Sequence, residues 1–419
     1  MSLLTYEEVR PWAKAIEAKV KSGEMPPWGA DPRYGKFSND RTLTPAQIDT
    51  IVAWVKNGAP KGDDADMPKA PALVTGWIFG TDPDFVLEMP TEYHVPPEGE
   101  LNMLNFYAPV PFKEDRFTRQ LEWRPGNRAA IHHGVASVGT LPEGSKLDDQ
   151  GQLFFADGTM ENDFATQSTA RRRTNFKFNL VVDYDPGRYA IPAHSDELGL
   201  RIPAGTYMRF NLHYQPTGKP ETDRSRIGMW FNTRTDVQEV YRKQAGDALP
   251  TAVDSRKGFF TVQGVSETWD FNNGREETHW PLIPAFADNY SVMGVTPVTE
   301  AITVYGFTPH MHLRGKDMTW YVTYPDGRRE TLLSVPNYHF NWQFYFDLAQ
   351  PMKIPAGSTI TNVAHYANTP NSKYNPAPDK DVYWSEQSWD EMYCPFIAYS
   401  IDSEAPKKGT QAKTSTQRQ

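Results

Sequence analysis

Proline is the feature that most restricts how this chain can fold. The sequence has 35 prolines, more than its 29 glycines, and they are scattered among short apolar runs. Because proline breaks helices and cannot donate to the ladder of a central strand, this distribution favours short strands joined by turns. From Phe85 onward, apolar residues such as Phe85, Leu87 and Met89 alternate with polar ones, and Pro-Gly, Asp-Gly and Pro-Ala-Gly turns interrupt the alternation. The pattern predicts antiparallel β-sandwiches.

The first 60 residues have a helical pattern instead. Thr5 and Glu8 form a capping box ahead of apolar residues at helical spacing. Thr44 and Gln47 form a second box, in which proline occupies the first helical position. Between the two predicted helices lies the irregular loop 25–28, with the sequence Met-Pro-Pro-Trp.

Composition divides the 419-residue chain, which is long enough for two or three domains. A stretch of Pro, Lys, Asp and Ala predicts a linker, and the irregular residues 233–255 predict a boundary between two β domains. The expected fold is mainly β, with two antiparallel, jelly-roll-like β-sandwich domains behind a small helical segment. The expected divisions are a helical segment (1–60), a linker (61–74), two β-sandwiches (75–240 and 241–402) and a disordered tail (403–419).

One internal echo supports two related domains. Ile-Pro-Ala-Gly at 202–205 is followed by His213, and the same four residues at 354–357 are followed by His365 with identical spacing. Each block predicts a tight turn that leads into a strand.

Charge and cysteine content exclude several classes of function. The formal net charge is -9 and no basic cluster offsets it, which argues against nucleic-acid binding. No run of about 18 apolar residues exists, so no membrane span is expected. Residues 1–20 lack the apolar centre of an export signal. Cys394 is the single cysteine, which excludes an intrachain disulfide and a thiolate-rich metal site, so any metal must be held by histidine, methionine or carboxylate.

Five of the ten histidines stand out by position. His310 and His312 follow the strand-like residues 302–307, and a spacing of two on a strand places both imidazoles on one face, where they can share a metal. His132 and His133 are adjacent, so both can bind one metal only at a bulge or strand end, which the following glycine permits. His213 is predicted to lie on the face of its strand opposite the apolar residues.

Plain structural roles compete with these interpretations. His310 and His312 could be surface residues of an edge strand. The histidines in polar loops or packed segments are predicted to have no role in a site; they are His94, His194, His279 and His339. His365 stays a rival ligand because of the echo.

Together the motifs resemble the copper type II, ascorbate-dependent monooxygenases, the family of peptidylglycine hydroxylating monooxygenase and dopamine β-monooxygenase. The resemblance covers residues 75–400 and is carried by His132-His133-Gly134, His213-Tyr214, Pro309-His310-Met311-His312 and Asp390-Glu391-Met392. The chain is especially similar to bacterial members in which the two β domains follow a c-type cytochrome domain.

The resemblance implies two mononuclear coppers, one in each β domain, facing each other across a solvent cleft. The site that relays an electron would be held by His132, His133 and His213. The catalytic site that binds O₂ and hydroxylates substrate would be held by His310, His312 and Met392, and a thioether favours Cu(I). Implied partners are O₂, a small-molecule substrate, and an electron donor such as an ascorbate-like reductant or a cytochrome. Family members are usually exported, which implies a periplasmic or secreted protein.

The chain departs from the family pattern in several places. A single cysteine cannot provide the disulfides of the animal members. Thr308 stands where peptide-amidating members have arginine, which makes a peptide carboxylate an unexpected substrate; Arg314 could serve another anion, although an exposed arginine is usually only solvated. Residues 1–60 resemble the latter part of the cytochrome domain, with Met25 in the place of the axial haem ligand. Because Cys-x-x-Cys-His is missing from those residues, we expect a truncated cytochrome domain and no haem c.

The predicted function is therefore a copper monooxygenase with an unknown substrate. One alternative is a copper-binding electron-relay module, or a subunit of a larger redox complex, without hydroxylase activity. Another is a pair of β-sandwiches that has kept its histidines but binds no metal. For Met392 alone, packing is the competing explanation. Oxygen uptake and copper content distinguish these alternatives.

Overall fold

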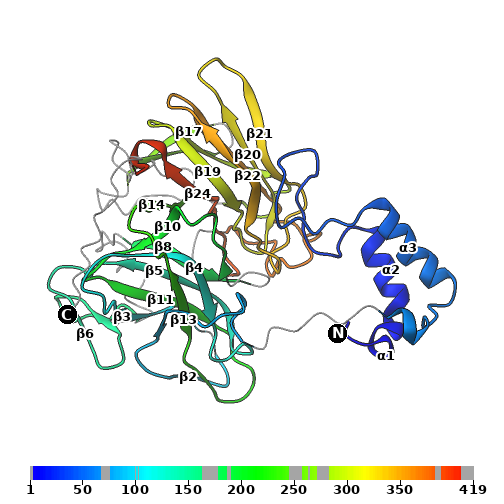
Figure 1. The fold of residues 1–419 in the computed structure, drawn as a ribbon, viewed down its shortest axis with the longest axis horizontal. Coiled ribbons are helices and arrows are strands. Elements are labelled where there is room, and N and C mark those ends of the chain that lie inside the picture. Colours follow the sequence, from blue (N-terminus) through cyan, green and yellow to red (C-terminus); the bar gives the residue numbers. More distant parts are fainter. Residues whose placement is uncertain are drawn as a thin grey trace, which may run out of the picture.

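The computed structural model describes residues 3–67, 76–99, 101, 103–162, 178–185, 190–244, 257–262, 265–270, 283–382 and 388–406. They form a mainly β protein with short N-terminal helices and two groups of sheets, one nearer each end of the chain (Figure 1). Among the described residues, no helix combines the length and apolar character needed to cross a membrane.

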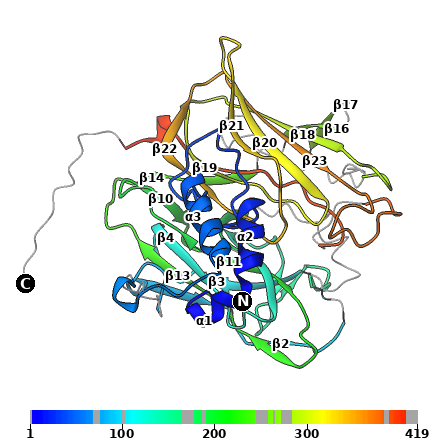
Figure 2. The same cartoon turned by 90° about the vertical axis from the view of Figure 1, so that its right-hand side faces the viewer.

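The N-terminal helices are α1 (Tyr6–Val9), α2 (Ala13–Lys21) and α3 (Pro45–Lys56), with 3-10 turns at Arg10–Trp12 and Asp64–Asp66. Helices α1 and α3 begin where the capping boxes predict, whereas a 3-10 turn separates α2 from α1. The Thr5 side chain accepts a hydrogen bond from the Glu8 amide, and the Thr44 side chain accepts one from the Gln47 amide. The helices stand to one side of the β structure in Figure 1 and in front of it in Figure 2. Residues 68–74 of the predicted linker lie outside the described residues.

Trp28 attaches the N-terminal segment to the second group of sheets. Its side chain is buried in the core of that group, with ring centroids 4.7 Å from Phe346 and 6.0 Å from both Phe37 and Phe344. The Asp31 amide also donates to the Ser334 carbonyl at 2.8 Å. The loop 25–28, which the sequence predicted only to be irregular, therefore anchors the N-terminal segment to the second group of sheets.

The first group of strands contains the motif of residues 132–134. Its strands are β1 (Phe85–Glu88), β2 (Tyr93–Val95), β3 (Leu104–Pro109), β4 (Arg116–Arg124), β5 (Ile131–Gly139), β6 (Lys146–Leu147), β7 (Leu153–Phe154), β8 (Phe178–Tyr184), β9 (Ala190–Ile191), β10 (Leu198–Ile202), β11 (Tyr207–Tyr214), β12 (Glu221–Asp223), β13 (Arg226–Phe231) and β14 (Gln238–Glu239).

Two sheets of this group share one core. One has the strand order β1-β13-β4-β10-β14, with β9 beside β4, and the other has the order β3-β11-β5-β8. Alternate residues of β11, including Met208, Phe210 and Leu212, are fully buried and pack in one cluster with Trp123 of β4 and Met229 of β13. The apolar faces of the two sheets therefore face each other.

The second group contains the motif of residues 309–312. Its strands are β15 (Tyr241–Gln244), β16 (Lys257–Val262), β17 (Val265–Asp270), β18 (Tyr290–Pro297), β19 (Ile302–Thr308), β20 (Gly315–Thr323), β21 (Arg329–Val335), β22 (Phe346–Ile354), β23 (Thr359–Tyr366) and β24 (Phe396–Ile401), followed by a 3-10 turn at Asp402–Glu404. One sheet has the order β15-β24-β19-β22 and the other β17-β16-β18-β23-β20-β21. Phe307 of β19 and Trp320 of β20 belong to one core cluster, with ring centroids 5.6 Å apart.

Order extends into the region predicted as a disordered tail. Residues 403–406 are described, and Ser403 and Glu404 belong to the 3-10 turn. The Tyr241 hydroxyl donates to a Glu404 carboxylate oxygen at 2.7 Å, which ties the turn to β15. The prediction for residues 403–406 was therefore wrong, and residues 407–419 lie outside the described part of the chain.

The chain passes from the first group to the second at Val240. β14 pairs in parallel with β10 of the first group, and β15 pairs with β24 of the second. We call the surface where the groups meet the seam. Val240 packs there against Tyr305 and Ala398, and the buried Arg242 of β15 donates to Asp183 of β8 at 3.1 Å. A buried ion pair therefore joins the two groups.

Replacing Asp183 with asparagine removes the counter-charge of the buried Arg242. We expect the free energy of unfolding to fall by about 3 kcal/mol, because an uncompensated charge stays buried. Chemical denaturation measures the change. Asp236→Asn is the matched control, since its partner Arg234 is exposed, and it should cost less than about 1 kcal/mol. Equal losses in the two variants would contradict a role for the pair in the seam.

Candidate metal centre

A β-bulge brings the two adjacent histidines to the same place. In the pairing of β5 with β11, His133 lies opposite His213 and Ile131 lies opposite Tyr214, so His132 is the extra residue. Such a bulge changes the direction in which a side chain points. The predicted distortion is present, at His132. Gly134 has another role: a Cβ there would lie 2.9 Å from the Trp123 ring, so this position accommodates a close approach of that ring.

His132, His133 and His213 form the first histidine group. One ring nitrogen from each lies within 4.8 Å of the others, a spacing from which the three could hold a metal ion. The Nδ1 atoms of His132 and His133 are 3.0 Å apart. The ring centroids of His133 and His213 are 5.0 Å apart. The structure thus brings together all three residues that the sequence predicts for this site.

The first histidine group is kept neutral by burial. Burial lowers the pKa of His213 to about 4, with a further contribution from His132. Burial also lowers the pKa of His133 well below its usual value, and the other histidines nearby act in the same direction. A neutral imidazole has a lone pair available for a metal, so these side chains are ready to act as ligands at neutral pH.

His310 and His312 form the second histidine group, but they do not lie on a strand. β19 ends at Thr308 and β20 begins at Gly315, so both histidines belong to the connection between them. The predicted strand position was therefore wrong. The backbone of His310 is nevertheless paired, since its amide and carbonyl both bond to Cys394, at 3.2 and 3.0 Å. The two imidazoles still meet, with ring centroids 5.4 Å apart.

Neighbouring side chains fix this connection. The Tyr338 hydroxyl accepts from the Met311 amide at 3.0 Å and donates to the Met311 carbonyl at 2.6 Å. The Gln343 amide nitrogen donates to the Phe340 carbonyl at 3.0 Å, so its oxygen faces His310 Nδ1 and accepts from it. A proton held on Nδ1 makes Nε2 the ring nitrogen of His310 that carries the lone pair.

Glu391 connects the second group to Met392. Its buried carboxylate accepts from the amides of His312 at 2.8 Å, Arg314 at 2.5 Å and Met392 at 3.2 Å. Burial raises the pKa of Glu391 to about 7, against the effect of these hydrogen bonds. The Tyr366 hydroxyl donates to the Met392 carbonyl at 2.9 Å. The segment that carries Met392 is thus tied to the turn that carries His312.

Arg314 is buried rather than solvated, contrary to the expectation from sequence. Its guanidinium donates to Asn368 at 3.0 Å and to the Trp389 carbonyl at 2.6 Å. The side chain therefore holds neighbouring loops together and is not available as an exposed anion site.

Unpartnered ring nitrogens show that the histidine groups fit a metal. His312 is 1% exposed, and among the described residues neither of its ring nitrogens makes a hydrogen bond of acceptable geometry. Nδ1 of His213 is also without such a bond to the described part of the chain. A buried polar atom without a partner costs roughly 1–3 kcal/mol. Coordination to a metal would offset that cost, and burial, which lowers the pKa of His312, keeps it neutral.

Phe340 lies between the two histidine groups. Its ring stacks on His132 with centroids 5.3 Å apart, and it meets His312 edge to face with centroids 6.0 Å apart. Phe340 is only 7% exposed. Where these rings meet, a buried aromatic side chain therefore takes the place of the solvent cleft that the resemblance implies.

The remaining histidines that the structure describes, and Met25, lie elsewhere. His365 Nδ1 is 2.6 Å from Asp317 on a neighbouring strand. His339 has its ring against Tyr374, His94 is exposed on β2, and His279 lies outside the described residues. His194 was predicted to lie in a polar loop without partners, yet its ring stacks on Tyr305 across the seam at 5.0 Å. Met25 is exposed in the loop after α2.

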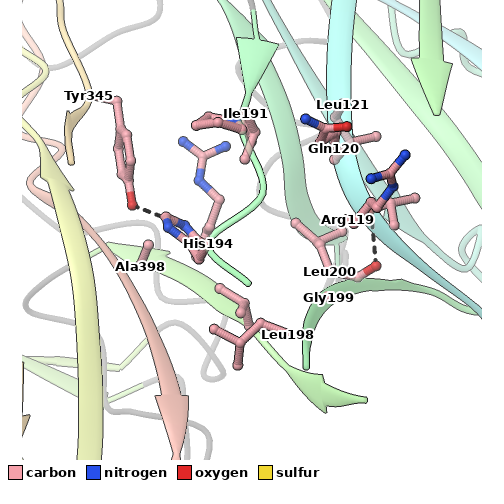
Figure 3. Close-up of a pocket in the computed structure, with 14 residues that line it drawn as sticks. Arg119, Gln120, Leu121, Ile191, His194, Leu198, Gly199, Leu200, Tyr345 and Ala398 are labelled. Carbon is pink, nitrogen blue, oxygen red and sulfur yellow. Dashed lines mark hydrogen bonds between the residues drawn. The ribbon is translucent and has the colours of Figure 1, made fainter. Parts of the chain in front are cut away.

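A cavity opens at the seam, away from the predicted ligands (Figure 3). It has an empty volume of ≈ 490 Å³, which includes open solvent. Its lining comes from β4, β9, β10 and His194 on one side and from Arg242, Tyr345 and Ala398 on the other. Figure 3 shows Tyr345 pointing toward His194, and these side chains are 3.4 Å apart. The lining is mostly apolar and includes no residue of either histidine group.

The sequence did not indicate a functional role for three residues, Phe340, Gln343 and Glu391. Phe340 and Gln343 lie beside His339, for which only a packing role was predicted. Glu391 appeared only as a member of the motif that contains Met392. Their roles depend on contacts with residues more than 30 positions away. The signal available in sequence was the placement of Glu391 directly before the predicted ligand Met392.

Comparison with known proteins identifies no family. No family model matches the chain, and no curated protein matches it significantly. Solved structures similar to parts of it include PNGF-II (10% identity, TM-score 0.25), a recombinant pro-11S globulin of pumpkin (9%, 0.14) and oxalate decarboxylase of Bacillus subtilis (8%, 0.14). These alignments cover 71%, 74% and 77% of this chain and 59%, 76% and 78% of the others. The chain thus spans about three fifths of PNGF-II, and likenesses with such TM-scores carry no argument.

In the metal-free protein, His213 should make the folded state less stable as the pH falls. Its pKa is about 4 in the folded state against an ordinary value of 6.5, so between these pH values the unfolded chain binds a proton that the folded chain does not. Its contribution lowers the free energy of unfolding by up to about 1.4 kcal/mol per pH unit on going down through this window. Denaturation at several pH values should show a shallower slope for His213→Gln. The exposed His94→Gln is the control, and equal slopes in both variants would contradict the prediction.

Proposed function

We propose that the protein is a copper-dependent monooxygenase that hydroxylates a C–H bond of a small-molecule substrate. The observation that carries the proposal is the pair of histidine groups, in which the buried His213 and His312 have ring nitrogens without a hydrogen bond to the described residues, and which one aromatic ring joins. Imidazole is a good ligand for both copper oxidation states, and a thioether favours Cu(I). The order of the motifs along the chain, which resembles that of the copper type II monooxygenases, adds support.

Each copper would have three protein ligands. The first site would use His132, His133 and His213. The second site would use His310, His312 and Met392. Bound copper would supply the redox chemistry that inserts one atom of O₂ into a C–H bond and converts the other to water, with two protons and with two electrons from an external donor. Three ligands per site leave room for a small molecule.

The chain's own residues orient the ligands. Gln343 accepts the proton on His310 Nδ1 and so fixes the tautomer in which Nε2 would be the copper ligand. Glu391 holds the His312 turn against the segment of Met392 through three backbone amides. Phe340 excludes water from the region between His132 and His312. A redox site needs ligands that are held in place, because they then do not rearrange as the charge changes.

We further propose that each group of sheets is a jelly-roll-like β-sandwich and that each holds one copper. The shared core clusters and the histidine groups, one in each group of sheets, support this arrangement. The electron donor would be an ascorbate-like reductant or a cytochrome, and the protein would work in the periplasm or outside the cell, where the family that it resembles is found.

The alternative is an electron-relay module without hydroxylase activity. It is favoured by the near absence of solvent around Phe340, because a relay needs close sites and no substrate pocket beside them. Both functions predict copper, so copper content alone does not distinguish them.

Reconstituted protein should contain two coppers per chain, because each histidine group provides one set of ligands. His133→Ala and His310→Ala should each reduce the copper content to about one, since removal of one ligand weakens one site and leaves the other intact. Elemental analysis measures this content, and His339→Ala is the control because His339 belongs to neither group. A wild-type protein without copper would disprove both the enzyme and the relay.

Ascorbate-driven oxygen uptake should separate the enzyme from the relay. We expect uptake with formation of a hydroxylated product in the wild type, and a loss of at least about a hundredfold in Met392→Ala, equal to about 2.7 kcal/mol in the barrier. Met67→Ala, which changes an exposed methionine, is the control. Copper that cycles between oxidation states without an oxygenated product, across a panel of candidate substrates, would favour the relay.

A further inference from the structure

The segment from Tyr338 to Phe344, which we call the 338–344 loop, connects β21 to β22 in the second group of sheets. It is attached to the second histidine group at two points. Tyr338 makes both hydrogen bonds to the Met311 backbone, and Gln343 bonds to His310 with one end of its amide and to the Phe340 carbonyl with the other. Phe340 is therefore held in a fixed place relative to His310 and His312.

The Phe340 ring of this loop contacts a residue of the first group of sheets. His132 belongs to the bulge of β5, and Phe340 stacks on it with an interplanar angle of 21°. On its edge, the same ring meets His312 at 88°. One side chain thus touches a proposed ligand of each metal site.

We propose that Phe340 is a positioning residue that couples the two copper sites. This inference rests on the proposed function. The ring would set the distance between the sites, and its two ring contacts would form a path for one electron from copper held at the first site to copper held at the second. Such a transfer would oxidise the first copper by one unit and reduce the second by one unit, and no bond would form or break at Phe340.

The packing explains why an aromatic ring suits this place. Phenylalanine has few rotatable bonds, so a buried ring keeps one orientation at a small cost in entropy. Leucine would fill much of the same space without a stacking face, whereas alanine would leave a cavity. Phe340→Leu therefore tests the ring itself, and Phe340→Ala tests the spacing.

The contact can be tested first without metal. In the metal-free wild type, the Phe340 ring current should shift the His132 Cε1 proton to higher field in the NMR spectrum. We expect this shift to vanish in Phe340→Leu and to persist in Trp342→Ala, which changes an exposed residue of the same loop. An unchanged His132 signal in Phe340→Leu would overturn the inference whatever the protein binds.

The coupling can then be tested in protein loaded with two coppers. With Cu(II) at both sites, the dipolar EPR spectrum should report one narrow distribution of copper–copper distances, which broadens in Phe340→Ala. After O₂ is added to the fully reduced protein, the Cu(II) signal should grow in one phase. In Phe340→Leu, half of the signal should lag about tenfold, as one electron must then take a poorer path.

The outcomes separate the two proposals. If the wild type and the variants all bind two coppers, but the distance distribution is unchanged in Phe340→Ala and the oxidation stays in one phase in Phe340→Leu, then the role of Phe340 is disproved and the copper function stands. If the wild type fails to bind two coppers, the proposed function fails. Trp342→Ala should match the wild type in both measurements.

Discussion

Arg242 and Asp183 face each other across the seam with almost no access to solvent, and their ion pair joins the two groups of sheets that carry the histidines. Burying two charges is costly, and the pair recovers the cost only when both partners are present at close range. The stacking of His194 on Tyr305 and the packing of Val240 against Ala398 close the same surface. Because the two groups of sheets are in contact at the seam, Phe340 of the second group can stack on His132 of the first.

Burying the histidine groups is unfavourable for the free energy of folding. Imidazoles without hydrogen-bond partners lose their interactions with water and gain nothing in return. The surrounding structure nevertheless holds them in place, through the bulge at His132 and the Glu391 carboxylate beneath His312. A side chain that is unfavourable for stability yet fixed from several directions is typical of a site built for a ligand.

Local features could be read from the sequence. The capping boxes at Thr5 and Thr44 involve residues three positions apart, and they occur as expected. The mainly β character could be predicted from the scattered prolines and the alternation of apolar and polar residues. The grouping of His132 with His213 could be predicted from the motif together with one expected bulge. The strand position of His310 was wrong because pairing with Cys394 replaces a regular ladder there. Phe340, Gln343 and the burial of Arg314 could not be predicted, because each depends on how distant loops meet after folding.

The bulge on β5 has a consequence for how such a site can be gained or lost. Ile131 and His133 keep their partners on β11, and the register shifts between them to accommodate His132. The position of the proposed ligands therefore depends on the length of this strand as well as on its residue types. Deleting His132 alone would remove the bulge and one proposed ligand in a single step.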